Sequence, residues 1–93
     1  MNYNIIATGS SGNAVVLNNN ILIDCGVSLK TLSDVKKQLD VVLLTHIHSD
    51  HFNKTTIKNL AAERPTLRFA CCEWLVSDLL ECGVSARNID VMK

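Results

Sequence analysis

Short apolar runs separated by polar turns fill the first quarter of the chain. The runs cover residues 2–7, 14–17 and 21–24, and glycine, serine and asparagine occupy residues 9–13 and 18–20 between them. Asparagine tolerates the left-handed backbone of tight turns, so the pattern predicts three strands in an antiparallel meander. Residues 9–13 are either a plain hairpin turn or a loop whose N–H groups bind an anion; the absence of lysine there favours the turn.

Helical spacing first appears after Ser28, a plausible N-cap residue. The apolar positions that recur with this spacing are Leu29, Leu32, Val35 and Leu39. They predict an amphipathic helix over residues 29–39, packed on the sheet. The apolar run 41–44 that follows reads as a buried strand. A strand, a helix and a strand in this order predict that runs 21–24 and 41–44 are parallel.

The second half of the chain alternates between helix and strand patterns. It predicts helices over residues 54–63 and 73–81 and strands over residues 67–71 and 89–91. Asn53 is the expected cap of the first of these helices, and Gly83 the stop signal of the second. The expected core-facing side chains are Ile57, Leu60 and Ala61, then Trp74, Leu75, Leu79 and Leu80. For Trp74, core packing is a simpler explanation than stacking on a substrate.

Length and composition limit this picture to one α/β domain. The chain has 93 residues, 47% of them apolar and 19% charged, and its formal net charge is zero. We expect one mixed sheet of about five or six strands with two or three helices on one face. There is no basic stripe of the kind that binds a phosphate backbone, so a nucleic-acid substrate would need metal ions to supply positive charge.

Four cysteines occur, at positions 25, 71, 72 and 82. An even count is compatible with disulfides in a secreted protein. Reduced, buried thiols are the better interpretation, because Cys71 and Cys72 are adjacent and the chain starts without a signal-like segment. No apolar run approaches the length of a membrane span. We therefore expect a cytoplasmic protein without membrane contact.

All three histidines lie within seven residues, directly after the strand 41–44. In extended backbone His46 and His48 project to the same side, where two imidazoles can ligate one cation. Asp50 continues this parity, whereas His51 needs a turn to join them or serves a second ion. Imidazole with carboxylate suits zinc, iron or manganese. The alternative is a polar loop that merely contains histidines.

Asp24 ends an apolar strand ahead of Cys25 and Gly26. Its carboxylate either forms the turn or accepts a hydrogen bond from a metal-bound imidazole and so orients it. A direct ligand role for Cys25 is less plausible than either of these.

The sequence His46-x-His48-x-Asp50-His51 after an apolar strand resembles the signature of the metallo-β-lactamase-fold hydrolases. Residues 9–13 and 21–26 are similar to the opening strands of that family, especially of its small nuclease-like bacterial branch. The resemblance implies that His46 and His48 bind one metal and that Asp50 and His51 bind a second. It also implies that Asp24 lies near the metals, and that the fold is the N-terminal half of an αββα sandwich.

The resemblance implies a zinc-dependent hydrolase, with nuclease-like phosphodiester cleavage as the expected activity of the parent protein. Zinc would activate water and polarise the substrate, and Asp50 would orient the nucleophile and accept its proton. Thioester, lactone or β-lactam hydrolysis uses the same ligands. No histidine follows His51, so the later ligands of the family are absent. The alternative is therefore a non-catalytic fragment, with residues 1–93 as a single truncated domain and an incomplete metal site.

Half of a sandwich leaves one sheet face uncovered. Runs of consecutive apolar residues, such as 41–44 and 21–23, predict burial on both faces, and a large bare apolar face is a liability for a monomer. We expect a two-fold homodimer in which a second copy covers that face. A charge at Val42 is expected to break it.

Overall fold

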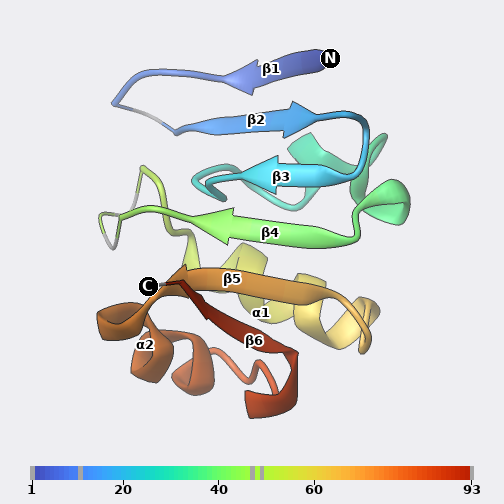
Figure 1. Ribbon diagram of the computed structural model, residues 1–93. Helices are drawn as coiled ribbons and strands as arrows, with labels where there is room; N and C mark the ends of the chain where they lie inside the picture. The colour runs from blue at the N-terminus through green and yellow to red at the C-terminus, as the bar shows by residue number, and fades with distance from the viewer. Residues whose placement is uncertain (1, 11, 47, 49, 93) are drawn as a thin grey trace.

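The protein is built on one six-stranded mixed sheet (Figure 1). The computed structural model describes residues 2–10, 12–46, 48 and 50–92, so Ser11, Ile47 and Ser49 of the predicted turn and motif lie outside the described residues. The strands are β1 (Tyr3–Ala7), β2 (Ala14–Leu17), β3 (Ile21–Ile23), β4 (Val41–Leu44), β5 (Arg68–Cys72) and β6 (Ile89–Met92).

The spatial order of the strands follows their order in the sequence. Strands β1, β2 and β3 pair antiparallel, which confirms the meander. Asn18 and Asn19 adopt φ values of 53° and 67° in the turn before β3, as the asparagine run predicts. Strands β3 to β6 pair parallel to one another, which confirms the parallel arrangement of runs 21–23 and 41–44.

The helical segments connect the parallel strands on one side of the sheet. They are α1 (Lys54–Glu63), α2 (Val76–Glu81) and four 3₁₀ turns: η1 (Lys30–Leu32), η2 (Lys36–Gln38), η3 (Glu73–Leu75) and η4 (Ala86–Asn88). Parallel crossovers are almost always right-handed, and the strand order advances in one direction, so all the connections fall on the same face. Figure 1 shows α1 behind β4 and β5. Among the described residues, no helix has the length and apolar character needed to cross a membrane.

The predicted helix over residues 29–39 is wrong, because the segment forms two separate 3₁₀ turns, η1 and η2. Its middle consists of Ser33, Asp34 and Val35, which are poor helix formers. The Ser33 hydroxyl donates to the Lys30 carbonyl at 2.7 Å, and such local bonds compete with a regular helix. Leu32 and Leu39 are nevertheless fully buried, so the apolar pattern identified the core positions correctly.

The predicted helix over residues 73–81 divides into η3 and the six-residue α2. Leu75 and Leu79 are fully buried, but Trp74 is 71% exposed and Leu80 46% exposed, so their predicted core positions are wrong. Short helical segments bury only a narrow stripe of side chains. Leu75, at the end of η3, and Leu79, in α2, are one turn apart and share that stripe. Gly83 ends the helix with a φ of 90°, as predicted.

The two faces of the sheet differ in burial. The face toward the helices is closed by side chains with exposed fractions of 2% or less: Ala14, Val16, Leu22, Val42, Leu44, Phe69 and Cys71. The alternate residues of the same strands are only half-buried, including Val41 and Leu43. On β1, Tyr3 and Ile5 are 68% and 54% exposed. One apolar face is therefore open, and Val42 does not belong to it.

Candidate metal centre

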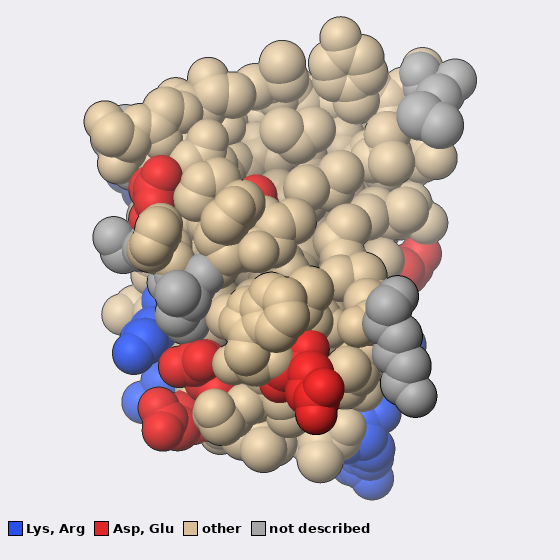
Figure 2. Space-filling model, turned by 60° about the vertical axis from the view of Figure 1, so that its left-hand side comes forward, with Lys and Arg blue, Asp and Glu red and all other residues tan. Residues whose placement is uncertain are grey.

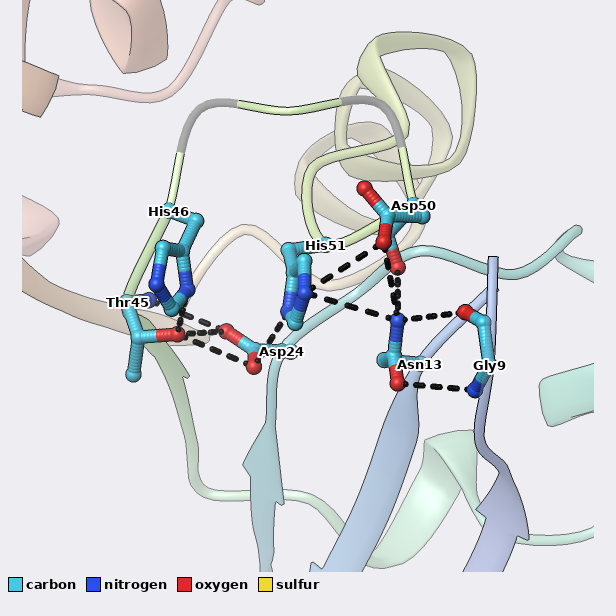
Figure 3. A network of polar contacts seen from close by, with 7 residues as sticks. All are labelled: Gly9, Asn13, Asp24, Thr45, His46, Asp50 and His51. Carbon is cyan, nitrogen blue, oxygen red and sulfur yellow. Dashed lines mark hydrogen bonds and ion pairs between the residues drawn. The ribbon is translucent and has the colours of Figure 1, made fainter. Parts of the chain in front are cut away.

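The predicted ligands gather at the ends of β3 and β4 (Figure 3). Asp24 follows β3, and Thr45 and His46 follow β4. Asp24 adopts a left-handed φ of 63°, and its N–H donates to the Leu43 carbonyl at 2.7 Å. This turn brings the Asp24 carboxylate next to the first residues of the histidine loop. Ligands at the carboxyl ends of parallel strands are the usual arrangement in α/β proteins.

The Asp24 carboxylate is the hub of the polar network. Its side chain is mostly buried, and His51 Nδ1 lies 2.8 Å from Oδ2. The Thr45 N–H and hydroxyl donate to Oδ1 at 2.9 and 2.7 Å. An ionised carboxylate only accepts hydrogen bonds, so the proton of the His51 pair is on Nδ1. The lone pair of His51 Nε2 is therefore available to bind a metal ion.

Asp24, His46 and His51 each offer one atom to a group whose ligand atoms lie within 4.8 Å of one another. The rings of His46 and His51 have centroids 4.5 Å apart. Asp24 could be a third ligand of one ion by distance alone. However, it already accepts bonds from Thr45 and His51, so its geometry suits an orienting partner better than a ligand.

His48 and Asp50 lie on either side of this group. The His48 ring stacks on His46 with centroids 6.5 Å apart, and its side chain is exposed. The His48 carbonyl accepts the N–H of His51 at 2.8 Å, which forms the turn that returns His51 to the site. Asp50 Oδ2 lies 3.4 Å from His51 Nε2. The turn thus brings His51 next to Asp50 and His46, one of the two arrangements that the sequence analysis left open.

The pair formed by Asp50 and His51 fits a transition metal. With His51 Nδ1 protonated, Nε2 and the Asp50 carboxylate face each other as two acceptors at 3.4 Å. Metal–nitrogen and metal–oxygen bonds of about 2.0–2.2 Å in a tetrahedral site place two ligands about 3.4 Å apart. A cation between the two atoms would replace their repulsion with two favourable bonds.

Asn13 is a site residue that the sequence analysis missed. Its Nδ2 donates to the Asp50 carbonyl at 3.0 Å and to the Gly9 carbonyl at 2.8 Å. Its backbone N–H donates to the same Asp50 carbonyl at 2.7 Å. The Gly9 N–H is bonded to Asn13 Oδ1. These N–H groups therefore hold the histidine loop, which favours the hairpin-turn interpretation of residues 9–13 over the anion site. The available signal was an asparagine within a glycine-rich turn.

Cys25 and Gly26, which follow Asp24, also hold the histidine loop in place. A side chain on Gly26 would overlap the Asp50 carbonyl, so only glycine fits there. The Cys25 N–H donates to the His51 carbonyl at 2.9 Å, and the Asn53 N–H donates to the Cys25 carbonyl at 2.6 Å. Burial, with a smaller effect of Asp24, raises the pKa of the Cys25 thiol to about 12. Cys25 therefore stays protonated at neutral pH and is a packing residue.

Helix α1 begins immediately after this loop. Asn53 Oδ1 accepts the N–H of Thr56 at 3.1 Å, which confirms the predicted cap. The buried Thr56 hydroxyl donates to the Val27 carbonyl at 2.6 Å. Ile57 and Leu60 are fully buried and Ala61 is half-buried, as predicted. The packed helix fixes the position at which the histidine loop ends.

Comparisons with known proteins agree with this architecture. Residues 19–91 match the model of the beta-lactamase superfamily domain. The chain is 38% identical over 61 residues to the exodeoxyribonuclease WalJ of Streptococcus pneumoniae serotype 2, and equally to that of strain R6. Each match covers 55% of this chain but only 23% of the relative. Because the family model spans most of the chain, including the histidine loop, the chain belongs to the metallo-β-lactamase superfamily.

Proposed function

We propose that the chain carries the metal site of a metal-dependent hydrolase that cleaves phosphodiesters in a nuclease-like reaction. The observation that carries the proposal is the acceptor pair of Asp50 and His51, 3.4 Å apart at the end of β4. The similarity to a pneumococcal exodeoxyribonuclease favours a nucleic-acid substrate over other esters.

The proposed roles follow from the network. His46 and His48 hold one metal ion, Asp50 and His51 hold a second, and Asp24 orients His51 through its Nδ1–H. Zinc is the proposed metal, with manganese or iron as substitutes, because the donors are imidazoles and a carboxylate. When bound, the metal would lower the pKa of a water molecule and polarise the phosphoryl group.

Asp50 is the proposed catalytic residue. Its Oδ2 faces His51, which leaves Oδ1 to accept a proton from the attacking water. Asn13 and Gly26 fix the Asp50 backbone from two sides, through hydrogen bonds and close packing. The Asp50 main chain is therefore held by the segment that follows β3 and by the turn before β2.

Hydrolysis of bis(4-nitrophenyl) phosphate with added zinc or manganese tests the function. We expect turnover that is abolished in His48→Ala and retained in Lys54→Ala, an exposed control outside the polar network. Turnover of a thioester or β-lactam substrate without phosphodiester cleavage would overturn the substrate class. A folded chain without any turnover would support the alternative, a non-catalytic fragment.

The cytoplasm is the proposed location. All four cysteines are free thiols, and Cys25, Cys71 and Cys82 are buried, as expected for a reducing compartment. Protein purified without reductant and then denatured should give four thiols per chain in a thiol assay. A lower count that is restored by reductant would contradict this location.

We also propose that a second copy of the chain covers the open sheet face. Figure 2 shows a broad surface without charged side chains toward the upper right of the molecule, with acidic side chains farther to the left. The strand register makes this face continuous, because Leu17 pairs with Ile21 and Ile21 with Val41. Tyr3 and Ile5 extend it at the β1 edge. A two-fold dimer would stack the two sheets about 10 Å apart.

Light scattering tests the dimer. We expect twice the mass of the chain, and a shift to monomer in Leu43→Asp, because Leu43 belongs to the open face. Ser33→Asp, which adds the same charge at an exposed turn, should leave the dimer intact. Circular dichroism verifies that both variants are folded. A monomeric wild-type chain would overturn the proposal. Val42 is unsuitable for this test, because it packs against the helices.

A further inference from the structure

We propose that Thr45 is a positioning residue that fixes the tautomer of His46 by relaying a hydrogen bond from Asp24. The Thr45 Oγ1 atom lies 2.7 Å from His46 Nδ1 and 2.7 and 3.0 Å from the two oxygens of Asp24 (Figure 3). The consequence for metal binding rests on the proposed function, whereas the tautomer itself does not.

The position of each proton follows from counting donors and acceptors. A threonine hydroxyl has one hydrogen to donate and can accept through its lone pairs. The Asp24 carboxylate only accepts, so the hydroxyl hydrogen is directed to Asp24. Toward His46, Oγ1 can then only accept, and the contact requires a hydrogen on His46 Nδ1. The lone pair of His46 is therefore on Nε2.

The same carboxylate thereby controls two histidines. His51 donates its Nδ1–H directly to Asp24 Oδ2 at 2.8 Å, and His46 donates through Thr45. In both rings Nε2 is then the nitrogen with the free lone pair, and the ring centroids lie 4.5 Å apart. One carboxylate, 8% exposed, thus orients two candidate ligands.

The Thr45 hydroxyl can be removed without releasing the main chain. The backbone N–H of Thr45 donates to Asp24 Oδ1 at 2.9 Å, independently of the side chain. Thr45→Val keeps the shape of the side chain and this backbone bond but removes the relay. His46 then becomes a mixture of tautomers, of which only part has the free Nε2. Loss of such an outer partner typically weakens metal affinity by about 10–100-fold.

The experiment compares Thr45→Val and Thr45→Ser with the wild type. Nitrogen-15 NMR of the histidine rings in the metal-free protein reports the tautomer, and a competition titration with zinc reports the affinity. We expect Nδ1–H at His46 in the wild type and in Thr45→Ser, which retains the hydroxyl. Thr45→Val should show mixed tautomers and zinc binding weakened about 10–100-fold. Thr55→Val, on an exposed position of α1, is the matched control and should change neither quantity.

The outcomes separate this proposal from the proposed function. A His46 ring that keeps Nδ1–H in Thr45→Val would overturn the relay, whatever the metal affinity. A wild-type chain that binds no zinc but shows the expected tautomers would overturn the metal site and leave the relay standing. If Thr45→Val does not fold, Thr45→Ala replaces it, because alanine fits within the space that threonine occupies.

Discussion

The Nε2 atom of His51 lies 3.4 Å from Oδ2 of Asp50, while the other ring nitrogen donates to Asp24. When His51 is neutral, its Nε2 and the Asp50 oxygen are therefore two acceptors that face each other in a part-buried position. Asn13 Nδ2 lies 3.3 Å from the Asp50 oxygen and 3.5 Å from the His51 nitrogen, but its two hydrogens have shorter contacts with the carbonyls of Gly9 and Asp50. A proton on Nε2, or a metal ion between the two atoms, would replace this contact between acceptors with favourable bonds.

Asp50→Asn should have opposite effects on stability and metal affinity. The amide can donate to His51 Nε2, so we expect the metal-free variant to be more stable by about 1 kcal/mol. Zinc affinity should fall at least about tenfold, because a charged ligand is lost. Urea unfolding in a chelator and a zinc titration measure the two effects. Lower stability together with unchanged affinity would contradict the acceptor-pair interpretation.

Gly26→Ala should disrupt the histidine loop. The added Cβ would overlap the Asp50 carbonyl, which is backbone and cannot swing away. We expect a loss of about 3 kcal/mol in the free energy of unfolding, as for severe overpacking. Gly9→Ala is the comparison, because a Cβ there meets nothing within 4 Å and carries only the cost of its φ of 114°. Urea unfolding measures both variants. A larger loss in the free energy of unfolding for Gly9→Ala than for Gly26→Ala would contradict the predicted overlap with Asp50.

The neighbours Leu79 and Leu80 should respond differently to truncation. Leu79 is fully buried and Leu80 is 46% exposed. We expect Leu79→Ala to cost about 2–5 kcal/mol through lost burial and the resulting cavity. Leu80→Ala, with identical chemistry in the same helix, should cost under about 1 kcal/mol. Chemical denaturation measures both. Equal losses would show that α2 is rotated so that Leu79 and Leu80 are buried to the same extent.

The ion pair of Arg68 and Asp90 should make the free energy of unfolding fall at low pH. Arg68 Nε and Nη2 each lie 2.7 Å from an Asp90 oxygen, and this bond lowers the pKa of Asp90 below its ordinary 3.8. Because the pKa of Asp90 is lower in the folded state, the ion pair stabilises the folded protein at pH values above the pKa of Asp90 in the unfolded chain. This contribution is lost as the pH falls through the pKa of Asp90 in the folded protein. In Arg68→Gln the Asp90 pKa, followed by NMR titration, should rise toward its ordinary value. An unchanged titration curve would show that the pair does not persist in solution.

The sequence alone determined where the strands lie, but not which face each of their residues presents. Residues 41–44 are apolar at every position, so their spacing could not show that Val42 packs against the helices and Leu43 does not. The asparagine turn before β3 is a local property, so it could be read from turn chemistry. The same holds for the position of the histidines at the end of β4. The clustering of all three histidines with Asp50, together with the similarity of the opening strands, was sufficient to indicate the superfamily that the family model confirms.

Only the tertiary structure decided which face of each helical segment is buried and how the site is held. Residues 29–39 have helical spacing, but their serine and aspartate side chains bond locally and the segment breaks into η1 and η2. Trp74 lies in η3, ahead of α2, and its side chain is exposed while that of the adjacent Leu75 is buried. The contacts of Asn13 and Gly26 with Asp50, and of Thr45 with Asp24, join positions between 21 and 37 residues apart. Such long-range contacts leave no periodic signal in the sequence, because folding alone brings the partners together.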